Sequence, residues 1–147
     1  MKIRAMVFVE NLFLRSKLNE LLSRRGYEIV AFSNPADCML LHNNTCHYAC
    51  TDILICDLPM PNVTMFQAIE KNLRTGCRIR NVALLSEDWS PEEVAHARKV
   101  SCKLFKKPLH FGELGLWLDE CENRINPQRL LSDELLQAKA PQSSTFL

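Results

Sequence analysis

The chain has 147 residues, of which 18 are lysine or arginine and 17 are aspartate or glutamate, so its formal net charge is +1. This length suits a single domain, and a composition of 47% hydrophobic and 24% charged residues excludes a disordered chain. A charge this close to zero does not favour nucleic acid or an anionic membrane as a partner, and no apolar run reaches the roughly 20 residues of a membrane span.

The N-terminal residues Met1 to Met6 run directly into an apolar segment and lack the pattern of a signal peptide. The sequence contains seven cysteines, an odd number that cannot pair fully within one chain. Reduced thiols are typical of the cytosol. We therefore expect a cytoplasmic protein.

Short apolar runs alternate with amphipathic segments along most of the chain. The expected strands are residues 5–9, 27–32, 53–56, 82–85 and 104–105. The expected helices are, in the same order, one that carries Leu14 to Leu22 and ends near Gly26, one that begins at Asn34-Pro35, residues 65–73, residues 91–100 and residues 111–121.

Five successive units of strand and helix predict a parallel sheet with helices on both faces, which is a doubly wound α/β fold. In such sheets the ligand site lies beyond the carboxyl ends of the strands. The residues at those ends are Glu10, Asn11, Asp57, Ser86, Glu87, Lys106 and Lys107. Carboxylates, a hydroxyl and lysines gathered in one place suit a divalent cation and a phosphoryl group.

The stretch from Asp52 to Pro61 reads DILICDLPMP, with an acid before an apolar strand, Asp57 at its end and Met-Pro shortly after. Lys107-Pro108 follows the fifth expected strand, and Ser86 follows the fourth. With these residues the chain, over about residues 3–123, resembles the receiver domain of two-component response regulators. The resemblance implies a (βα)5 flavodoxin-like (CheY-like) fold around a five-stranded parallel sheet.

The resemblance also implies a phosphorelay function in signal transduction. Asp57 would be the phospho-acceptor, which takes a phosphoryl group from a histidine kinase or a phosphotransfer protein. Mg²⁺ held by Asp57, Glu10 and the backbone carbonyl of Pro59 would neutralise the anionic oxygens during transfer. Lys107 would pair with the phosphoryl group, and Ser86 would donate a hydrogen bond to it. The output would be altered binding to a downstream protein partner, so the domain is no enzyme beyond phosphorylation and hydrolysis at its own aspartate.

Four positions depart from the family pattern and favour an alternative, a pseudo-receiver that binds partners without phosphorylation. Val9 replaces the first of two acids after the first strand, and we expect weak Mg²⁺ binding because losing such an acid costs about 10–100-fold in metal affinity. Glu87 stands where the family has a small residue, and Met65 where it has a glycine. Leu104 occupies the position of an aromatic switch residue, while the neighbouring Phe105 should point to the opposite face of the strand.

The loop before the third strand carries a second group of candidate metal ligands, His42, Cys46, His47 and Cys50. A structural zinc site needs about four ligands, which these residues could supply. The alternative is an ordinary polar loop with half-buried thiols. In the last expected helix, we expect Trp117 to pack in the core rather than on a partner surface.

Residues 1–125 are expected to form the receiver domain and residues 126–147 a C-terminal extension. Asn126-Pro127 resembles a helix cap with a first-turn proline, and Leu130, Leu131, Leu135 and Leu136 follow at helical spacing. This amphipathic helix would either fold back on the domain or pair with a second copy in a homodimer, and the last residues would form a flexible tail or linker. The extension is too short for an output domain, so the chain is either a single-domain receiver or a piece of a longer regulator.

Overall fold

The computed structural model describes residues 1–32, 48–57 and 78–132. Within these ranges the strands are Arg4–Val9 (β1), Glu28–Phe32 (β2), Ile53–Asp57 (β3), Asn81–Ser86 (β4) and Cys102–Lys106 (β5), and the helices are Leu12–Arg24 (α1), Pro91–Lys99 (α3) and Phe111–Arg124 (α4). The helices expected after Asn34 and over residues 65–73 lie outside the described residues. None of the described helices has both the length and the apolar character that a membrane crossing requires.

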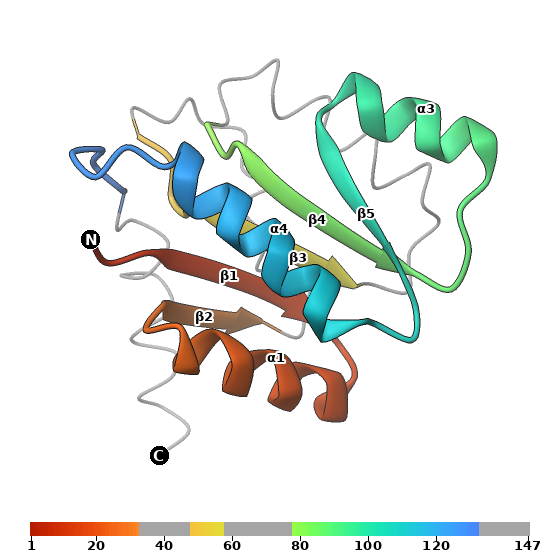
Figure 1. The fold of residues 1–147 in the computed structure, drawn as a ribbon, viewed down its shortest axis with the longest axis horizontal. Coiled ribbons are helices and arrows are strands. Elements are labelled where there is room, and N and C mark those ends of the chain that lie inside the picture. The colour runs from red at the N-terminus through yellow and green to blue at the C-terminus, as the bar shows by residue number, and fades with distance from the viewer. Residues whose placement is uncertain (33–47, 58–77, 133–147) are drawn as a thin grey trace.

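The strands form one parallel sheet in the order β2-β1-β3-β4-β5 (Figure 1). Flavodoxin-like folds have this strand order. The chain adds β2 on one side of β1 and then adds β3, β4 and β5 on the other side. The predicted fold class is therefore confirmed, and each predicted strand is present within about a residue or two of its expected limits. The largest difference is β5, which runs over five residues where the sequence predicted two.

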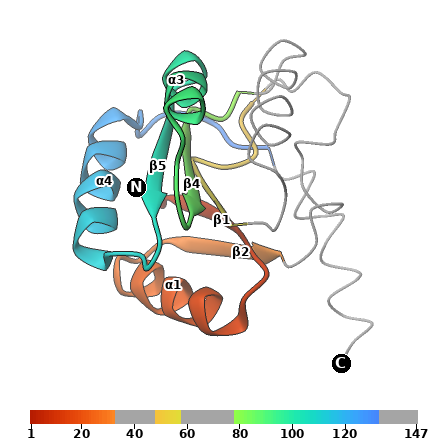
Figure 2. The same ribbon diagram turned by 90° about the vertical axis from the view of Figure 1, so that its right-hand side faces the viewer.

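Strand β1 is buried on both faces, as its uninterrupted apolar sequence predicts. Ala5, Val7 and Val9 face one core cluster, which also contains side chains of α1 and α4. Met6 and Phe8 face a second cluster, which is closed by Ala97 of α3. Figures 1 and 2 show the resulting layers, with α1 and α4 on one side of the sheet and α3 on the other.

Local signals explain where the helices begin and end. The Asn11 side chain caps α1 by accepting a hydrogen bond from the backbone N–H of Leu14, and Gly26 follows the helix with a φ of 79°, a conformation that suits glycine. Helix α3 starts with the predicted capping box, in which the Ser90 side chain accepts from the N–H of Glu93 and the Glu93 side chain accepts from the N–H of Ser90.

The predicted start of a sixth helix at Asn126 is wrong, because residues 126–132 are not helical. The Asn126 side chain accepts from the N–H of Gln128 and forms a single turn. The chain then passes the N-terminal edge of the sheet, where Leu131 forms a parallel bridge with Ala49 and the N–H of Ser132 donates to the Ala49 carbonyl at 2.8 Å. These tertiary contacts outweigh the local helix signal, and the remainder of the expected helix lies outside the described residues.

Candidate functional site

The carboxyl ends of β1 and β3 bring two of the predicted site residues to the same edge of the sheet. Val9 and Asp57 are register partners, and Glu10 directly follows Val9. Asp57 is the last residue of β3 and is only 8% exposed, whereas Glu10 is exposed. The site therefore contains one carboxylate within the sheet and one at its solvent boundary.

Lys107 is the cation that faces the buried carboxylate. Its Nζ lies 2.6 Å from Oδ1 of Asp57, and the side chains are 32% and 9% exposed. The backbone holds this geometry, because the N–H of Lys107 donates to the carbonyl of Ser86 at 2.7 Å as β5 leaves the sheet beside β4. A buried carboxylate needs such a partner, since an unpaired charge would be costly to remove from water.

Ser86 ends β4, and its hydroxyl is directed to its own loop. Its Oγ donates to the carbonyl of Asp88 at 3.1 Å. The Asp88 side chain in turn accepts from the N–H of Trp89 at 2.9 Å and lies 4.0 Å from the ammonium of Lys106. The Nε1 of Trp89 donates to the carbonyl of Phe105 at 3.0 Å, which fastens this loop to β5.

Asp88 was not singled out in the sequence, although an acid two residues after a strand that ends in a serine is a local signal for such a loop. Glu87 is exposed. The predicted donor Pro59 and the substituted glycine position Met65 lie outside the described residues.

Two of the residues that depart from the family pattern, Val9 and Leu104, lie within strands of the sheet. Val9 is completely buried in the cluster beneath α1 and α4, so it adds no oxygen to the site. Leu104 is half-buried on the face that contains Trp89, while Phe105 is buried on the opposite face, as predicted. The ring of Phe105 meets Trp117 edge-on with centroids 5.9 Å apart, which also confirms the prediction that Trp117 packs in the core.

The donors for Mg²⁺ can be tested against this geometry. Glu10 and Asp57 both lie at the carboxyl edge, on neighbouring strands. Mg²⁺ commonly takes one or two protein carboxylates and keeps several waters, so this pair of hard oxygen donors fits the ion. Across residues 1–32, 48–57 and 78–132 there is no group of three His, Cys, Asp or Glu residues placed to hold a metal.

The cysteine and histidine cluster of the loop before β3 is described only at its last member. Cys50 is 6% exposed and belongs to an apolar core cluster with Met6 and Leu54. His42, Cys46 and His47 lie outside the described residues.

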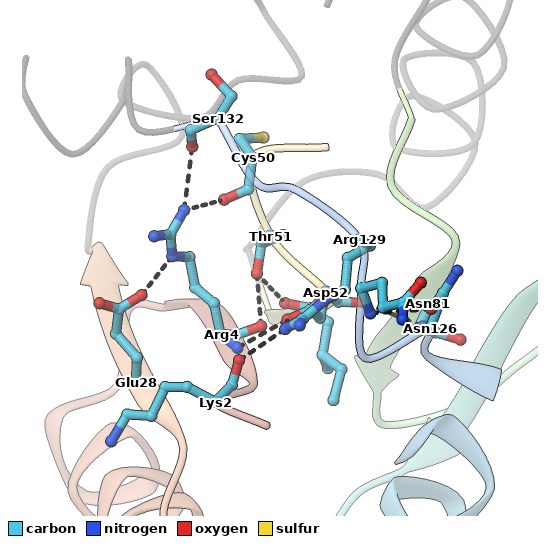
Figure 3. Close-up of polar contacts among 12 residues, drawn as sticks. Lys2, Arg4, Glu28, Cys50, Thr51, Asp52, Asn81, Asn126, Arg129 and Ser132 are labelled. Carbon is cyan, nitrogen blue, oxygen red and sulfur yellow. Dashed lines mark hydrogen bonds and ion pairs between the residues drawn. The ribbon is translucent and has the colours of Figure 1, made fainter. Parts of the chain in front are cut away.

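A second polar cluster lies at the opposite, N-terminal edge of the sheet, around Asp52 (Figure 3). Arg129 donates from Nε to Oδ1 at 2.8 Å and from Nη2 to Oδ2 at 2.6 Å, while the backbone N–H of Arg4 donates to Oδ2 at 3.0 Å. The Arg4 side chain reaches Glu28 and the carbonyls of Cys50 and Ser132. Asp52, the first residue of the stretch that resembles the receiver family, thus lies at the opposite edge of the sheet from Asp57 and has a structural role.

No protein-family model matches the sequence, and no curated protein is similar to it. Solved structures with the same fold include the chemotaxis protein CheY4 of Vibrio cholerae, at 18% identity and a TM-score of 0.64, with 82% of this chain and 99% of that chain covered. A putative pilus assembly protein of Burkholderia thailandensis matches at 21% identity and a TM-score of 0.65, with 82% of this chain and 98% of that chain covered.

The receiver domain of a sensor histidine kinase from Pseudomonas aeruginosa, with a magnesium ion coordinated in its active site cleft, matches at 14% identity and a TM-score of 0.60, with 84% and 99% covered. At such low identities these similarities establish the fold. The chain therefore has the fold of the CheY-like receiver domains of response regulators, as the resemblance in its sequence predicted.

Proposed function

We propose that this chain is a receiver domain in a phosphorelay, in which Asp57 accepts a phosphoryl group from a histidine kinase or a phosphotransfer protein. The observation that carries the proposal is the contact of 2.6 Å between Nζ of Lys107 and Oδ1 of Asp57 at the carboxyl edge of the sheet. An aspartate beside a lysine at this edge of a parallel sheet combines a nucleophile with a fixed positive charge for an anionic group.

The chemistry follows from the positions of these groups. A carboxylate oxygen of Asp57 would attack the phosphorus of a phosphohistidine as the P–N bond breaks, and the imidazole nitrogen would keep the bonding electron pair and take up a proton. Lys107, already at hydrogen-bond distance, would move its contact from the carboxylate to the phosphoryl oxygens. Mg²⁺, bound by Asp57, Glu10 and the carbonyl of Pro59, would supply charge neutralisation for the same oxygens.

The loop after β4 would transmit the change. The Ser86 hydroxyl, now donating to the Asp88 carbonyl, would instead donate to the phosphoryl group. Because Trp89 ties the same loop to the backbone of β5, a movement of Ser86 would alter the surface formed by this loop and β5. A downstream protein partner would read that surface.

The proposal is tested by incubating the protein with Mg²⁺ and phosphoramidate or acetyl phosphate and measuring its intact mass. We expect the wild type to gain one phosphoryl group and Asp57→Ala to gain none. Asp88→Ala removes a carboxylate from the neighbouring loop and serves as the matched control, which should still be phosphorylated. A wild type that gains no phosphoryl group, or an Asp57→Ala protein that gains as much as the wild type, would refute the assignment.

A pseudo-receiver, which binds its partners without phosphorylation, is the second candidate, and the buried Val9 favours it. Val9 occupies an acid position with a side chain that is 0% exposed and packed in the core, so the site lacks one of the family's acids. Beryllofluoride with Mg²⁺ separates the two functions. Chemical shift changes at Ser86 and Lys107 support the phospho-acceptor, and unchanged spectra support the pseudo-receiver.

The remaining features of this function are proposals of the same kind. We place the domain in the cytoplasm, with residues 1–125 as the receiver and residues 126–147 as an extension. Light scattering tests a homodimer through the extension. Twice the monomer mass would support it, and the monomer mass would exclude it.

A further inference from the structure

A large groove opens at the N-terminal edge of the sheet, on the side of the molecule opposite the Asp57 site. It has a volume of about 1290 Å³ and lies between the starts of β4 and β5, the last turn of α4 and the segment that follows α4. Figure 1 shows these elements at the same end of the sheet. The proposed phosphorelay chemistry makes no use of this groove.

The groove is strongly basic. Among the residues that the structure describes, its lining contains six lysines and arginines and two carboxylates, Asp52 and Glu120. The basic residues are Arg78, Arg80, Lys99, Lys103, Arg124 and Arg129. The whole chain has a net charge of only +1, so this edge concentrates positive charge that the total conceals.

The two described carboxylates form their ion pairs with Arg124 and Arg129, and neither pairs with Arg80 or Lys103. Asp52 is buried and already accepts two hydrogen bonds from Arg129, so that pair is internal to the fold. Glu120 lies 3.9 Å from Nη1 of Arg124 on an exposed helix surface, where such pairs are weak. Arg80, Lys103 and Arg124 therefore give the groove cationic groups from separate parts of the chain.

One of these cations is held in place. Nε and Nη2 of Arg124 donate to Oδ1 of Asn81 at 3.1 and 3.0 Å, and the Asn81 amide in turn donates to the carbonyl of Asp52. A guanidinium whose orientation is fixed loses less conformational entropy when it binds an anion. Its planar group of donors suits the oxygens of a phosphate.

Apolar side chains line the same groove. Tyr48 is 48% exposed and Leu130 is 61% exposed, while Ile79 and Val82 form buried parts of the lining. Exposed aromatic rings are stacking surfaces for nucleobases. A ligand that carries both phosphate groups and a flat ring would use both parts of this lining.

We propose that this groove binds a nucleotide with two or three phosphate groups. Arg80, Lys103 and Arg124 bind the phosphates, and Tyr48 with the apolar part of the lining contacts the base. Nucleotide binding here is independent of Asp57, because Asp57 lies at the opposite edge of the sheet and does not line the groove.

The experiment is calorimetric titration with ATP in the presence of EDTA, so that no metal links the nucleotide to Asp57. We expect the wild type and Asp57→Ala to bind ATP equally. Arg80→Glu with Lys103→Glu should weaken binding by at least about tenfold, and the milder double change to glutamine by less. Lys17→Glu with Arg24→Glu makes the same charge change on α1, outside the groove, and should leave the affinity within about twofold.

Adenosine and inorganic tripolyphosphate identify which part of the ligand is recognised. A higher affinity for ATP than for either adenosine or tripolyphosphate supports a nucleotide site. Equal affinity for tripolyphosphate and ATP would overturn the role of the apolar lining and with it the nucleotide assignment. No binding of ATP by a folded wild type, or the same loss in the groove and α1 variants, would overturn the site itself.

Discussion

Arg129 and Asp52 form a two-bonded ion pair across 77 residues of sequence, with Nε to Oδ1 at 2.8 Å and Nη2 to Oδ2 at 2.6 Å. The carboxylate is 4% exposed and also accepts from the backbone N–H of Arg4 at the start of β1. Nη2 of Arg129 donates further to the carbonyl of Lys2. The side-chain hydrogen bonds to Asp52 raise the pKa of Arg129, so its guanidinium stays protonated. This pair fastens the segment after α4 to the edge where β1 and β3 begin.

We expect Arg129→Ala to lower the free energy of unfolding by about 2 kcal/mol, because it leaves the Asp52 carboxylate buried without its cation. Urea denaturation measures the change. Arg98→Ala, on the exposed surface of α3, removes the same side chain where no such pair exists in the described structure and should change stability by less than about 0.5 kcal/mol. Equal effects of the two substitutions would show that the pair does not stabilise the fold.

This pair also shows what the sequence could and could not predict. The apolar runs and amphipathic segments are local patterns, so they predicted the strands, their parallel order and the convergence of Asp57 and Lys107 at one edge. The contact of Asp52 with Arg129 depends on where the chain goes after α4, and no local pattern encodes it. Asn126-Pro127 carried a helix signal, but the bridge of Leu131 with Ala49 and the ion pair of Arg129 with Asp52 hold this segment against the edge of the sheet in a non-helical path.

The edge contact between Phe105 and Trp117 joins β5 to α4, and both side chains are almost fully buried. We expect Phe105→Ala to destabilise the protein by about 3–4 kcal/mol, because it leaves a cavity beneath the helix. Leu104→Ala, on the half-buried face of the same strand, should cost about half as much or less.

Trp117 fluorescence provides a second measure of the same contact, since the chain has only two tryptophans and Trp89→Phe leaves Trp117 alone. In that background Phe105→Ala should shift the emission to longer wavelength, as water reaches the indole. An unchanged spectrum together with an unchanged urea midpoint would contradict the packing.

Stability should fall at alkaline pH. Burial raises the pKa of the Cys102 thiol from 9.0 to about 12 and that of the Cys121 thiol to about 11. Burial is likewise the largest cause that raises the pKa of Tyr27 to about 12, against the opposing effect of Arg25. The unfolded chain therefore loses these protons at lower pH than the folded chain does.

By proton linkage, the contribution of these protonated groups to the free energy of unfolding is complete below about pH 9. It declines as the pH rises from there towards 12. We expect the urea midpoint to be level between pH 7 and the onset of this range and then to decrease. Cys102→Ala should be less stable at neutral pH but should show a smaller alkaline decrease. A decrease of the same size in both proteins would exclude Cys102 as a contributor.

Restoring an acid at position 9 tests the proposed metal site directly. We expect Val9→Asp to raise Mg²⁺ affinity by about 10–100-fold, because a carboxylate at the register partner of Asp57 adds a third acid to the edge that contains Glu10. Without Mg²⁺ the variant should be less stable than the wild type, since the new carboxylate enters a position that is 0% exposed in the core.

Urea denaturation with and without excess Mg²⁺ measures both effects, because an ion that binds the folded state alone raises the unfolding free energy by linkage. Val9→Asn is the matched control, with nearly the same shape and no charge, and Mg²⁺ should stabilise it no more than it stabilises the wild type. If Mg²⁺ stabilises Val9→Asp and Val9→Asn equally, then a carboxylate at position 9 does not bind the ion, and the prediction is wrong.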